Sequence, residues 1–389
     1  MPAPARLLAL LLLLLAIAPA VPRAAAAGDA PTAIRDVVNR VIPTLMANDD
    51  IPGVAVGITF AGSEYFFEYG LASKKPNRPV TRDTLFEIGS ITKTFTATLA
   101  SWAQVEHRLA LSDETAKYLP FLHGSSFGRV SLIDLGTHTP GGLPLQVPAG
   151  ITTEAQLLDW LKKWRPAYPP GTYRTYSNIG IGMLGLITAK SMDRDFSALV
   201  EQQLFPALGM TSSFLTVPTS KMADYAEGYA QDGGPVRMSP GVLWPPAYGV
   251  KSTAADLIRF VEANMGLLEL DGTLQRAITQ SHMGYFRAGP MIQDLIWEQY
   301  PYPVSLEALL EGNSPHMIFD ATPVTRIKPP EEPRGRVWIN KTGSTNGFGA
   351  YVAFVPEKRL GIVILANRSY PIADRVTAAY RILTSLTKE

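Results

Sequence analysis

The sequence Phe86-Glu-Ile-Gly-Ser-Ile-Thr-Lys-Thr-Phe95 leads into a stretch that is expected to form a buried helix. Apolar residues recur at helical spacing from residue 90 to residue 108, which predicts a buried helix with Ser90 in its first turn. Ser90 and Lys93 are three residues apart, so they face the same side, near the partial positive charge of the helix N-terminus. A lysine is seldom fully buried without a partner. The apolar positions are Ile91, Phe95, Leu99, Trp102 and Val105.

Two clusters farther along the chain, Tyr176-Ser-Asn178 and Lys341-Thr-Gly343, complete a set of reactive groups. With Ser90 and Lys93 they supply a hydroxyl nucleophile, an amine three residues on, a phenol with an amide, and a second amine beside a hydroxyl. The phenol of Tyr176 can act as a base only if its pKa, about 10 when free, is lowered. Two flanking lysines would lower it. The combination predicts a serine acyl-transfer site.

Each of these residues also has a plain structural interpretation when it is taken alone. Ser90 or Asn178 could cap a helix, and Tyr176 could be a packed aromatic ring with a satisfied hydroxyl. Lys341-Thr-Gly343 could be a solvated strand end with a turn glycine. The order and separation of the three clusters favour the functional interpretation.

The chain resembles a class C β-lactamase, of the serine β-lactamase and penicillin-recognising superfamily, over essentially the whole mature chain. The resemblance implies hydrolysis of β-lactams, with cephalosporins preferred, through a serine acyl-enzyme and without a metal or organic cofactor. It rests on the stretches at residues 86–95, 170–180 and 340–349, together with Gly141-Gly-Leu-Pro-Leu-Gln-Val-Pro148, Ala247-Tyr-Gly-Val-Lys-Ser252 and Leu365-Ala-Asn367.

The mechanism expected from this resemblance starts with attack of Ser90 on the strained amide carbonyl. Tyr176 and Lys93 would take and relay the proton, backbone N–H groups of Ser90 and Ser344 would hold the oxyanion, and Tyr176 would activate water for deacylation. Catalytic roles are therefore expected for Ser90, Lys93, Tyr176 and Lys341.

The resemblance also implies a set of substrate contacts. Gln146 and Asn178 would bind the acylamino side chain, Tyr248 would line the pocket wall, and Lys341 with Thr342 would meet the substrate carboxylate. The expected substrate-binding residues are Gln146, Asn178, Tyr248, Thr342, Gly343, Ser344 and Arg375.

Two positions depart from the family pattern. Ile372 stands where the family usually has a carboxylate-binding asparagine, although the nearby arginine is kept as Arg375. Ser369 likewise stands where another asparagine is common. These departures bear on fine specificity.

Composition and length favour a single two-lobed globular enzyme, and nothing in the sequence demands more than a monomer. The small-molecule β-lactam substrate is what the resemblance implies. Hydrophobic residues make up 46% of the 389 residues and charged residues 18%, which allows a large core. The net charge of +1 offers neither a footprint for nucleic acid nor a polybasic patch for a membrane.

The first 27 residues have the pattern of an export signal. Arg6 precedes an apolar run at residues 7–18, and Ala25-Ala-Ala27 is a small-residue cleavage site. We expect cleavage after Ala27, with cuts after Ala20 or Ala26 and an uncleaved anchor as the alternatives. Export to the periplasm without a stable membrane anchor follows. The absence of cysteine excludes disulfides, a thiol nucleophile and a cysteine-linked lipid anchor.

Periodicity predicts an α+β fold in two lobes. Strands are expected at residues 53–60, 64–71, 336–339, 349–355 and 360–366, with helices at 34–46 and about 373–386. They would form a discontinuous α/β lobe from residues 28–80 and 331–389, a five-stranded antiparallel sheet flanked on one face by the terminal helices. Residues 81–330 would form a mostly helical lobe, with the active site between the two, and residues 301–333 are assigned no regular structure.

Competing chemistries find little support. The five histidines show no metal-binding spacing, and no Gly-x-Ser-x-Gly elbow occurs, although His138 could in principle serve Ser90 as a base. Gly180-Ile-Gly-Met-Leu-Gly185 matches the dinucleotide-binding fingerprint, but it follows a turn and not a strand, so close helix packing explains it better. The remaining rivals are a penicillin-recognising peptidase or esterase, and a β-lactam sensor that is acylated without turnover.

Overall fold

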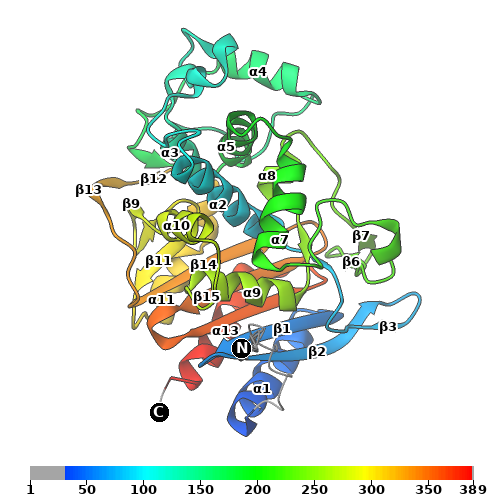
Figure 1. Cartoon of the computed structure of the whole chain (residues 1–389). Helices are drawn as coiled ribbons and strands as arrows, with labels where there is room; N and C mark the ends of the chain where they lie inside the picture. Colours follow the sequence, from blue (N-terminus) through cyan, green and yellow to red (C-terminus); the bar gives the residue numbers. More distant parts are fainter. Residues whose placement is uncertain (1–30, 388–389) are drawn as a thin grey trace, which may run out of the picture.

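The computed structural model describes residues 31–387 and is built around one large antiparallel sheet (Figure 1). Its ten strands, from one edge to the other, are β13 (Thr325–Glu331), β9 (Gly284–Ala288), β10 (Met291–Gln293), β11 (Glu298–Pro301), β14 (Val337–Ser344), β15 (Gly349–Val355), β16 (Leu360–Ala366), β1 (Gly53–Phe60), β2 (Ser63–Ser73) and β3 (Arg78–Pro79). The expectation of an α+β fold with an antiparallel sheet is confirmed.

The expected number of five strands was too low. The five predicted strands are present and adjacent, in the order β14-β15-β16-β1-β2, and the other five extend the sheet on both sides. The missed strands have only two to seven residues, and periodicity is weak over such lengths. β13 also contains Pro329 and Pro330, which a sheet tolerates because this strand lies at its edge.

Residues 301–333 are therefore more ordered than the sequence indicated. They contain β13 and two helices, α11 (Leu306–Gly312) and α12 (Pro315–Phe319). Pro315 lies in the first turn of α12, and Pro329 and Pro330 lie in the edge strand; a missing N–H is tolerated at both places.

Helices cover both faces of the sheet (Figure 1). On one face α1 (Thr32–Asn48) packs beside α13 (Ile372–Ser385), as expected for the terminal helices, and both share an apolar cluster with β1, β15 and β16. The other face carries α9 (Ala254–Asn264), beyond which lies the mainly helical part of the chain. Its longer helices are α2 (Thr92–Val105), α4 (Glu154–Lys163), α5 (Asn178–Ser191) and α10 (Gly272–Ser281).

Helix α2 is buried, as its apolar pattern predicted, and it lies at the centre of the helical part. Twelve of its fourteen residues are buried, and α5, α10 and α8 (Trp244–Tyr248) pack around it. The glycine-rich stretch lies inside α5, where an added Cβ would come within 2.6 Å of Leu243 at Gly182 and within 2.4 Å of Pro246 at Gly185. These glycines allow close packing of α5 against the segment at residues 243–246.

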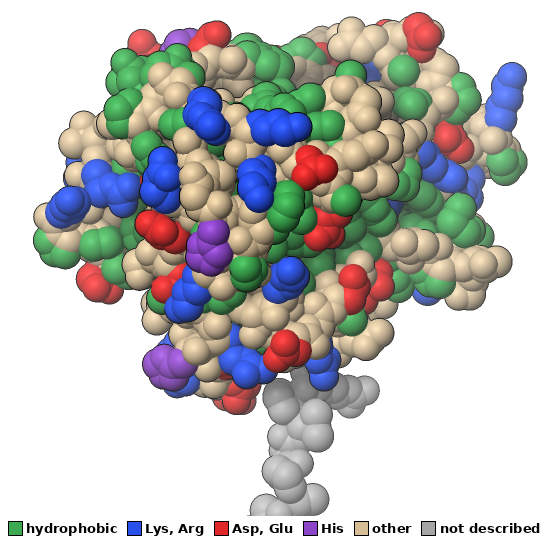
Figure 2. Space-filling view, turned by 90° about the horizontal axis from the view of Figure 1, so that it is seen from above, with side chains coloured by type: hydrophobic (Ala, Val, Ile, Leu, Met, Phe, Trp, Pro, Cys, Tyr) green, Lys and Arg blue, Asp and Glu red, His purple; other side chains and the backbone are tan. Residues whose placement is uncertain are grey.

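No helix within residues 31–387 combines the length and apolar character needed to cross a membrane. The expected signal peptide, residues 1–27, lies outside the described residues. On the face shown in Figure 2, basic and acidic side chains are interspersed, so that face does not carry the one-sided positive field typical of nucleic-acid binding.

Candidate active site

A cavity of about 630 Å³ lies between the β14 side of the sheet and the helical part of the chain. Its apolar lining comes partly from α12, including Ile318 and Phe319, and its polar lining comes from the three motif clusters. The structure thus brings together ten residues singled out in the sequence: Ser90, Gln146, Tyr176, Asn178, Tyr248, Lys341, Thr342, Gly343, Ser344 and Ile372.

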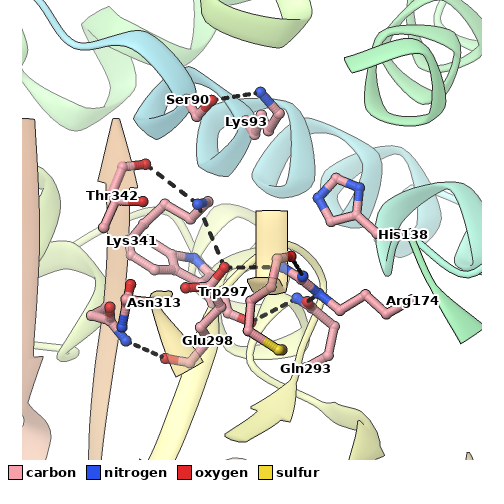
Figure 3. A network of polar contacts seen from close by, with 12 residues as sticks. Ser90, Lys93, His138, Arg174, Gln293, Trp297, Glu298, Asn313, Lys341 and Thr342 are labelled. Carbon is pink, nitrogen blue, oxygen red and sulfur yellow. Dashed lines mark hydrogen bonds and ion pairs between the residues drawn. The ribbon is translucent and has the colours of Figure 1, made fainter. Parts of the chain in front are cut away.

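Ser90 lies in a short 3₁₀ turn, Gly89–Ile91, that leads directly into α2. Lys93 is fully buried behind it, and its Nζ donates hydrogen bonds to Ser90 Oγ at 2.8 Å and to the Ala247 carbonyl at 2.7 Å (Figure 3). Burial, helped by the charge of Lys341, lowers the pKa of Lys93 to about 8 against the opposing effect of Tyr176. Near neutral pH Lys93 can therefore exchange a proton with Ser90.

Tyr176 lies between the two lysines that the sequence placed beside it. The Nζ atoms of Lys93 and Lys341 are each 5.2 Å from the centre of its ring. Burial alone would raise the pKa of the phenol, but the charges of Lys341 and Lys93 and a hydrogen bond with Ser90 lower it to about 8. The phenolate is thus accessible near neutral pH, and it is in contact with the hydroxyl of Ser90.

Glu298 forms an ion pair with Lys341 and was not recognised in the sequence. Its Oε1 lies 3.5 Å from Lys341 Nζ and 3.3 Å from Nη2 of the buried Arg174, which also donates to Gln293 Oε1 at 2.7 Å (Figure 3). Glu298 belongs to β11, a strand that the sequence pattern did not reveal. Arg174 stands two residues before Tyr176, and that proximity was the one available signal.

Glu87 is a second missed carboxylate, although it lies within the quoted Ser90 motif. It is 1% exposed, and its oxygens accept hydrogen bonds from Tyr225 Oη at 2.6 Å, Met238 N at 2.9 Å and Thr345 Oγ1 at 2.5 Å. Met238 and Thr345 both line the cavity. The buried carboxylate of Glu87 therefore connects two cavity-lining segments that are far apart in the sequence, at Met238 and at Thr345.

The end of β14 lies directly against the turn that carries Ser90. Gly89 has φ +51°, and a Cβ on it would lie 2.5 Å from Ser344 N. A Cβ on Gly343 would lie 1.9 Å from the Ile88 carbonyl oxygen. Glycine at both positions lets the backbones touch, and Ser90 and Ser344 both line the cavity.

Asn178 is the first residue of α5, but it does not cap that helix. Ser177 does so, because its Oγ accepts from the N–H groups of Ile179 and Gly180. Asn178 Nδ2 instead donates to Gln146 Oε1 at 2.9 Å, and its buried Oδ1 has no hydrogen-bond partner among residues 31–387. The two amides form a polar pair at the cavity wall.

Arg375, which was predicted to bind substrate, is not among the residues that line the cavity, and its substrate-binding role stays a prediction. Its guanidinium is fully buried behind β14 and donates to the Gly343 carbonyl at 2.6 Å, to Ser344 Oγ at 3.0 Å and to the Tyr370 carbonyl. The motif placed this residue near the site, but packing of α13 on the sheet directs it to the backbone. Ile372, one helical turn earlier, does face the cavity.

No group of three or more histidine, aspartate or glutamate side chains within residues 31–387 is arranged to hold a metal ion. The chemistry of the cavity is that of a serine flanked by a lysine and an activated phenol, with a second lysine beside a threonine.

Comparison with known proteins agrees with this geometry. The β-lactamase family model matches residues 38–386. A β-lactamase of Lysobacter lactamgenus is 51% identical over 346 residues, which cover 89% of this chain and 90% of the relative. A solved class C β-lactamase in complex with cefoxitin is 51% identical, with a TM-score of 0.89 over 91% of this chain and 99% of that one.

The chain belongs to the class C β-lactamases.

As a class C β-lactamase it hydrolyses β-lactams through a serine. The same fold also occurs in a D-alanine carboxypeptidase of Burkholderia cenocepacia, which is 59% identical, with a TM-score of 0.87 over 90% of this β-lactamase and 99% of that chain.

Proposed function

We propose that Ser90 is the nucleophile of this class C β-lactamase and that Tyr176 and Lys93 move its proton. The observation that carries the proposal is the 2.8 Å hydrogen bond between Lys93 Nζ and Ser90 Oγ, beside a phenol whose pKa is lowered to about 8. An alcohol becomes a competent nucleophile only when a base, here the Tyr176 phenolate, lies within hydrogen-bond reach of its hydroxyl.

In the acylation step the Ser90 proton passes to the Tyr176 phenolate as Oγ bonds to the lactam carbonyl carbon. The oxyanion is held by the N–H groups of Ser90 and Ser344. The carbon–nitrogen bond then breaks, and Tyr176 returns the proton to the lactam nitrogen. In deacylation Tyr176 takes a proton from water as the water oxygen bonds to the acyl carbon. The bond between that carbon and Ser90 Oγ then breaks, and Tyr176 returns the proton to the leaving Oγ.

The remaining lining residues bind the substrate. Lys341 and Thr342 meet its carboxylate, Gln146 and Asn178 meet the amide of its acylamino side chain, and Tyr248 forms the wall opposite. The unpartnered Oδ1 of Asn178 supports this assignment, because a buried acceptor without a donor is costly until a ligand supplies one. Cephalosporins are the preferred substrates, and cefoxitin, which a solved class C relative binds, fits the same cavity.

A D-alanine carboxypeptidase activity is the second candidate, because the Burkholderia cenocepacia enzyme of that name is 59% identical. A peptide substrate would use the same nucleophile and lysines, and its terminal carboxylate would meet the same Lys341 and Thr342. The two activities differ in whether the acyl-enzyme formed from a β-lactam is hydrolysed rapidly.

The enzyme acts as a monomer in the periplasm after removal of residues 1–27. It binds neither nucleic acid nor a membrane. The pattern of an export signal at residues 1–27 and the low net charge of the chain support these assignments.

Intact-mass measurement after addition of a penicillin tests the nucleophile. Ser90→Ala should form no covalent adduct, whereas Ser239→Ala, which removes another hydroxyl from the cavity lining, should be acylated normally. An adduct on the alanine variant of residue 90 would remove Ser90 from the mechanism. Rapid turnover of a chromogenic cephalosporin by the unmodified enzyme selects the β-lactamase, and a stable adduct selects the carboxypeptidase.

A further inference from the structure

His138 makes three contacts that all converge on Tyr176. Its carbonyl oxygen accepts the N–H of Thr175 at 2.8 Å, and its Nδ1 accepts the N–H of Ser177 at 3.2 Å. Its ring lies on the ring of Tyr176, with the centroids 4.3 Å apart and the planes inclined by 39°. One residue therefore holds the phenol itself and the peptide groups on both sides of it.

The backbone of His138 is adapted to these contacts. Its φ of +61° lies in the left-handed region, which is uncommon for a residue other than glycine. The side chain is 1% exposed, so the imidazole is in contact with protein groups and not with solvent. Such a conformation persists when the surrounding structure requires it, and outliers of this kind cluster at functional sites.

The imidazole is held in one protonation state. Burial, followed by the charges of Arg174, Lys93 and Lys341, keeps the pKa of His138 well below its usual value. Because Nδ1 accepts a hydrogen bond, the single ring proton is on Nε2, which has no hydrogen-bond partner among residues 31–387. A neutral ring between three cations does not add to the repulsion around Tyr176.

We infer that His138 is a positioning residue that fixes the phenol of Tyr176 between the two lysines, an inference that rests on the proposed role of Tyr176 as the base. It is not itself the base for Ser90, whose Oγ is hydrogen-bonded by Lys93. The phenol keeps its lowered pKa only while it stays close to Lys93 and Lys341, and that proximity is what His138 maintains.

Two substitutions separate the contacts of this residue. His138→Phe keeps a flat ring over Tyr176 but removes the acceptor for the Ser177 N–H. His138→Asn keeps an acceptor near the position of Nδ1 and suits a left-handed backbone, although it loses the stacked ring. Thermal unfolding of both variants establishes that they are folded before any activity is compared.

Steady-state kinetics with a chromogenic cephalosporin gives the first readout. A displacement of the base by about 1 Å costs about 100-fold in rate, so His138→Phe should lower kcat by ~10- to 100-fold with little change in KM. His138→Asn should retain most of the wild-type kcat. Wild-type kcat in the phenylalanine variant would overturn the inference, as would an equal loss of kcat in both variants.

The pKa of the phenol gives a readout that does not depend on activity. Phenolate absorbance is titrated in the wild type and in Tyr176→Phe, and the difference between the two curves belongs to Tyr176. Lys341, Lys93, Arg174 and Glu298 are the charged groups that face it. His138→Phe should move this titration upward toward the ordinary tyrosine value, because a displaced phenol is farther from the lysines.

An unshifted titration in folded His138→Phe would also overturn the inference. The proposed mechanism has its own separate test in the same series. If Tyr176→Phe keeps its turnover, Tyr176 is not the base. The phenol titration of the His138 variants still reports whether His138 holds the ring.

Discussion

Gly89→Ala is the sharpest test of the contact between the Ser90 turn and the end of β14. The new Cβ would lie 2.5 Å from Ser344 N, whereas ordinary contact begins at 3.4 Å, so the two backbones must separate by 0.9 Å (3.4 − 2.5). A shift of that size at a catalytic centre costs about 100-fold in rate, and loss of one oxyanion donor costs about 100- to 1000-fold. We expect kcat to fall by about 100-fold, with acylation as the slowed step.

The substitution also places an L residue at a φ of +51°, which costs roughly 1–2 kcal/mol of folding stability. Gly124→Ala is the matched control, because Gly124 has φ +78° and no atom within 4 Å of the added Cβ. Both variants carry the cost of the positive φ, and Gly89→Ala should lose more stability than the control in chemical denaturation because of its backbone contact. The control should keep wild-type kcat. Normal kcat in Gly89→Ala, or an equal loss in the control, would refute the reasoning.

Three further predictions concern the base, the cavity wall and the buried arginine. Because the base is the phenolate and its pKa is about 8, kcat/KM should rise with pH up to about 8 and then level off. Tyr176→Phe should lower kcat by ~100-fold or more and remove that rise. A flat wild-type profile would contradict the assignment. Ile372→Asn should change kcat/KM for a cephalosporin acid by the worth of one hydrogen bond, ~0.5 to 1.5 kcal/mol, and leave its esterified analogue unaffected, whereas equal effects on both would indicate a packing role. Arg375→Met should lower the free energy of unfolding by ~1–3 kcal/mol for each carbonyl left without a partner. It should change KM equally for the cephalosporin acid and for its esterified analogue. Weaker binding of the acid alone would indicate that Arg375 binds the substrate carboxylate.

Long periodic segments were predictable from the sequence because local pattern and tertiary burial agree there. Helix α2 and the central strands carry apolar runs that the structure buries on every side, and both terminal helices fall within a few residues of their expected bounds. The short strands β9, β10 and β11 carry no such signal. They form because neighbouring strands hold them, which is a property of the assembled sheet and not of their own sequence.

The same distinction separates the recognised site residues from the missed ones. Ser90 and Lys93 belong to one helix turn, so their spacing alone places them together. Glu298 reaches Lys341 only because β11 pairs with β14, with Glu298 opposite Asn340 in the register. Arg375 was assigned by its position in a motif, yet the direction of its side chain depends on how α13 packs on the sheet.

The pairing of β1 with β16 determines when this enzyme can fold. Val54 pairs with Ala366, so the two strands are separated by 312 positions (366 − 54), and closing that loop costs about 5 kcal/mol of chain entropy. Until β16 has been synthesised, the β1–β2 hairpin has one unpaired edge, and an isolated hairpin is marginally stable at best. The β1–β2 hairpin therefore cannot join the rest of the sheet before the chain has been made as far as residue 366.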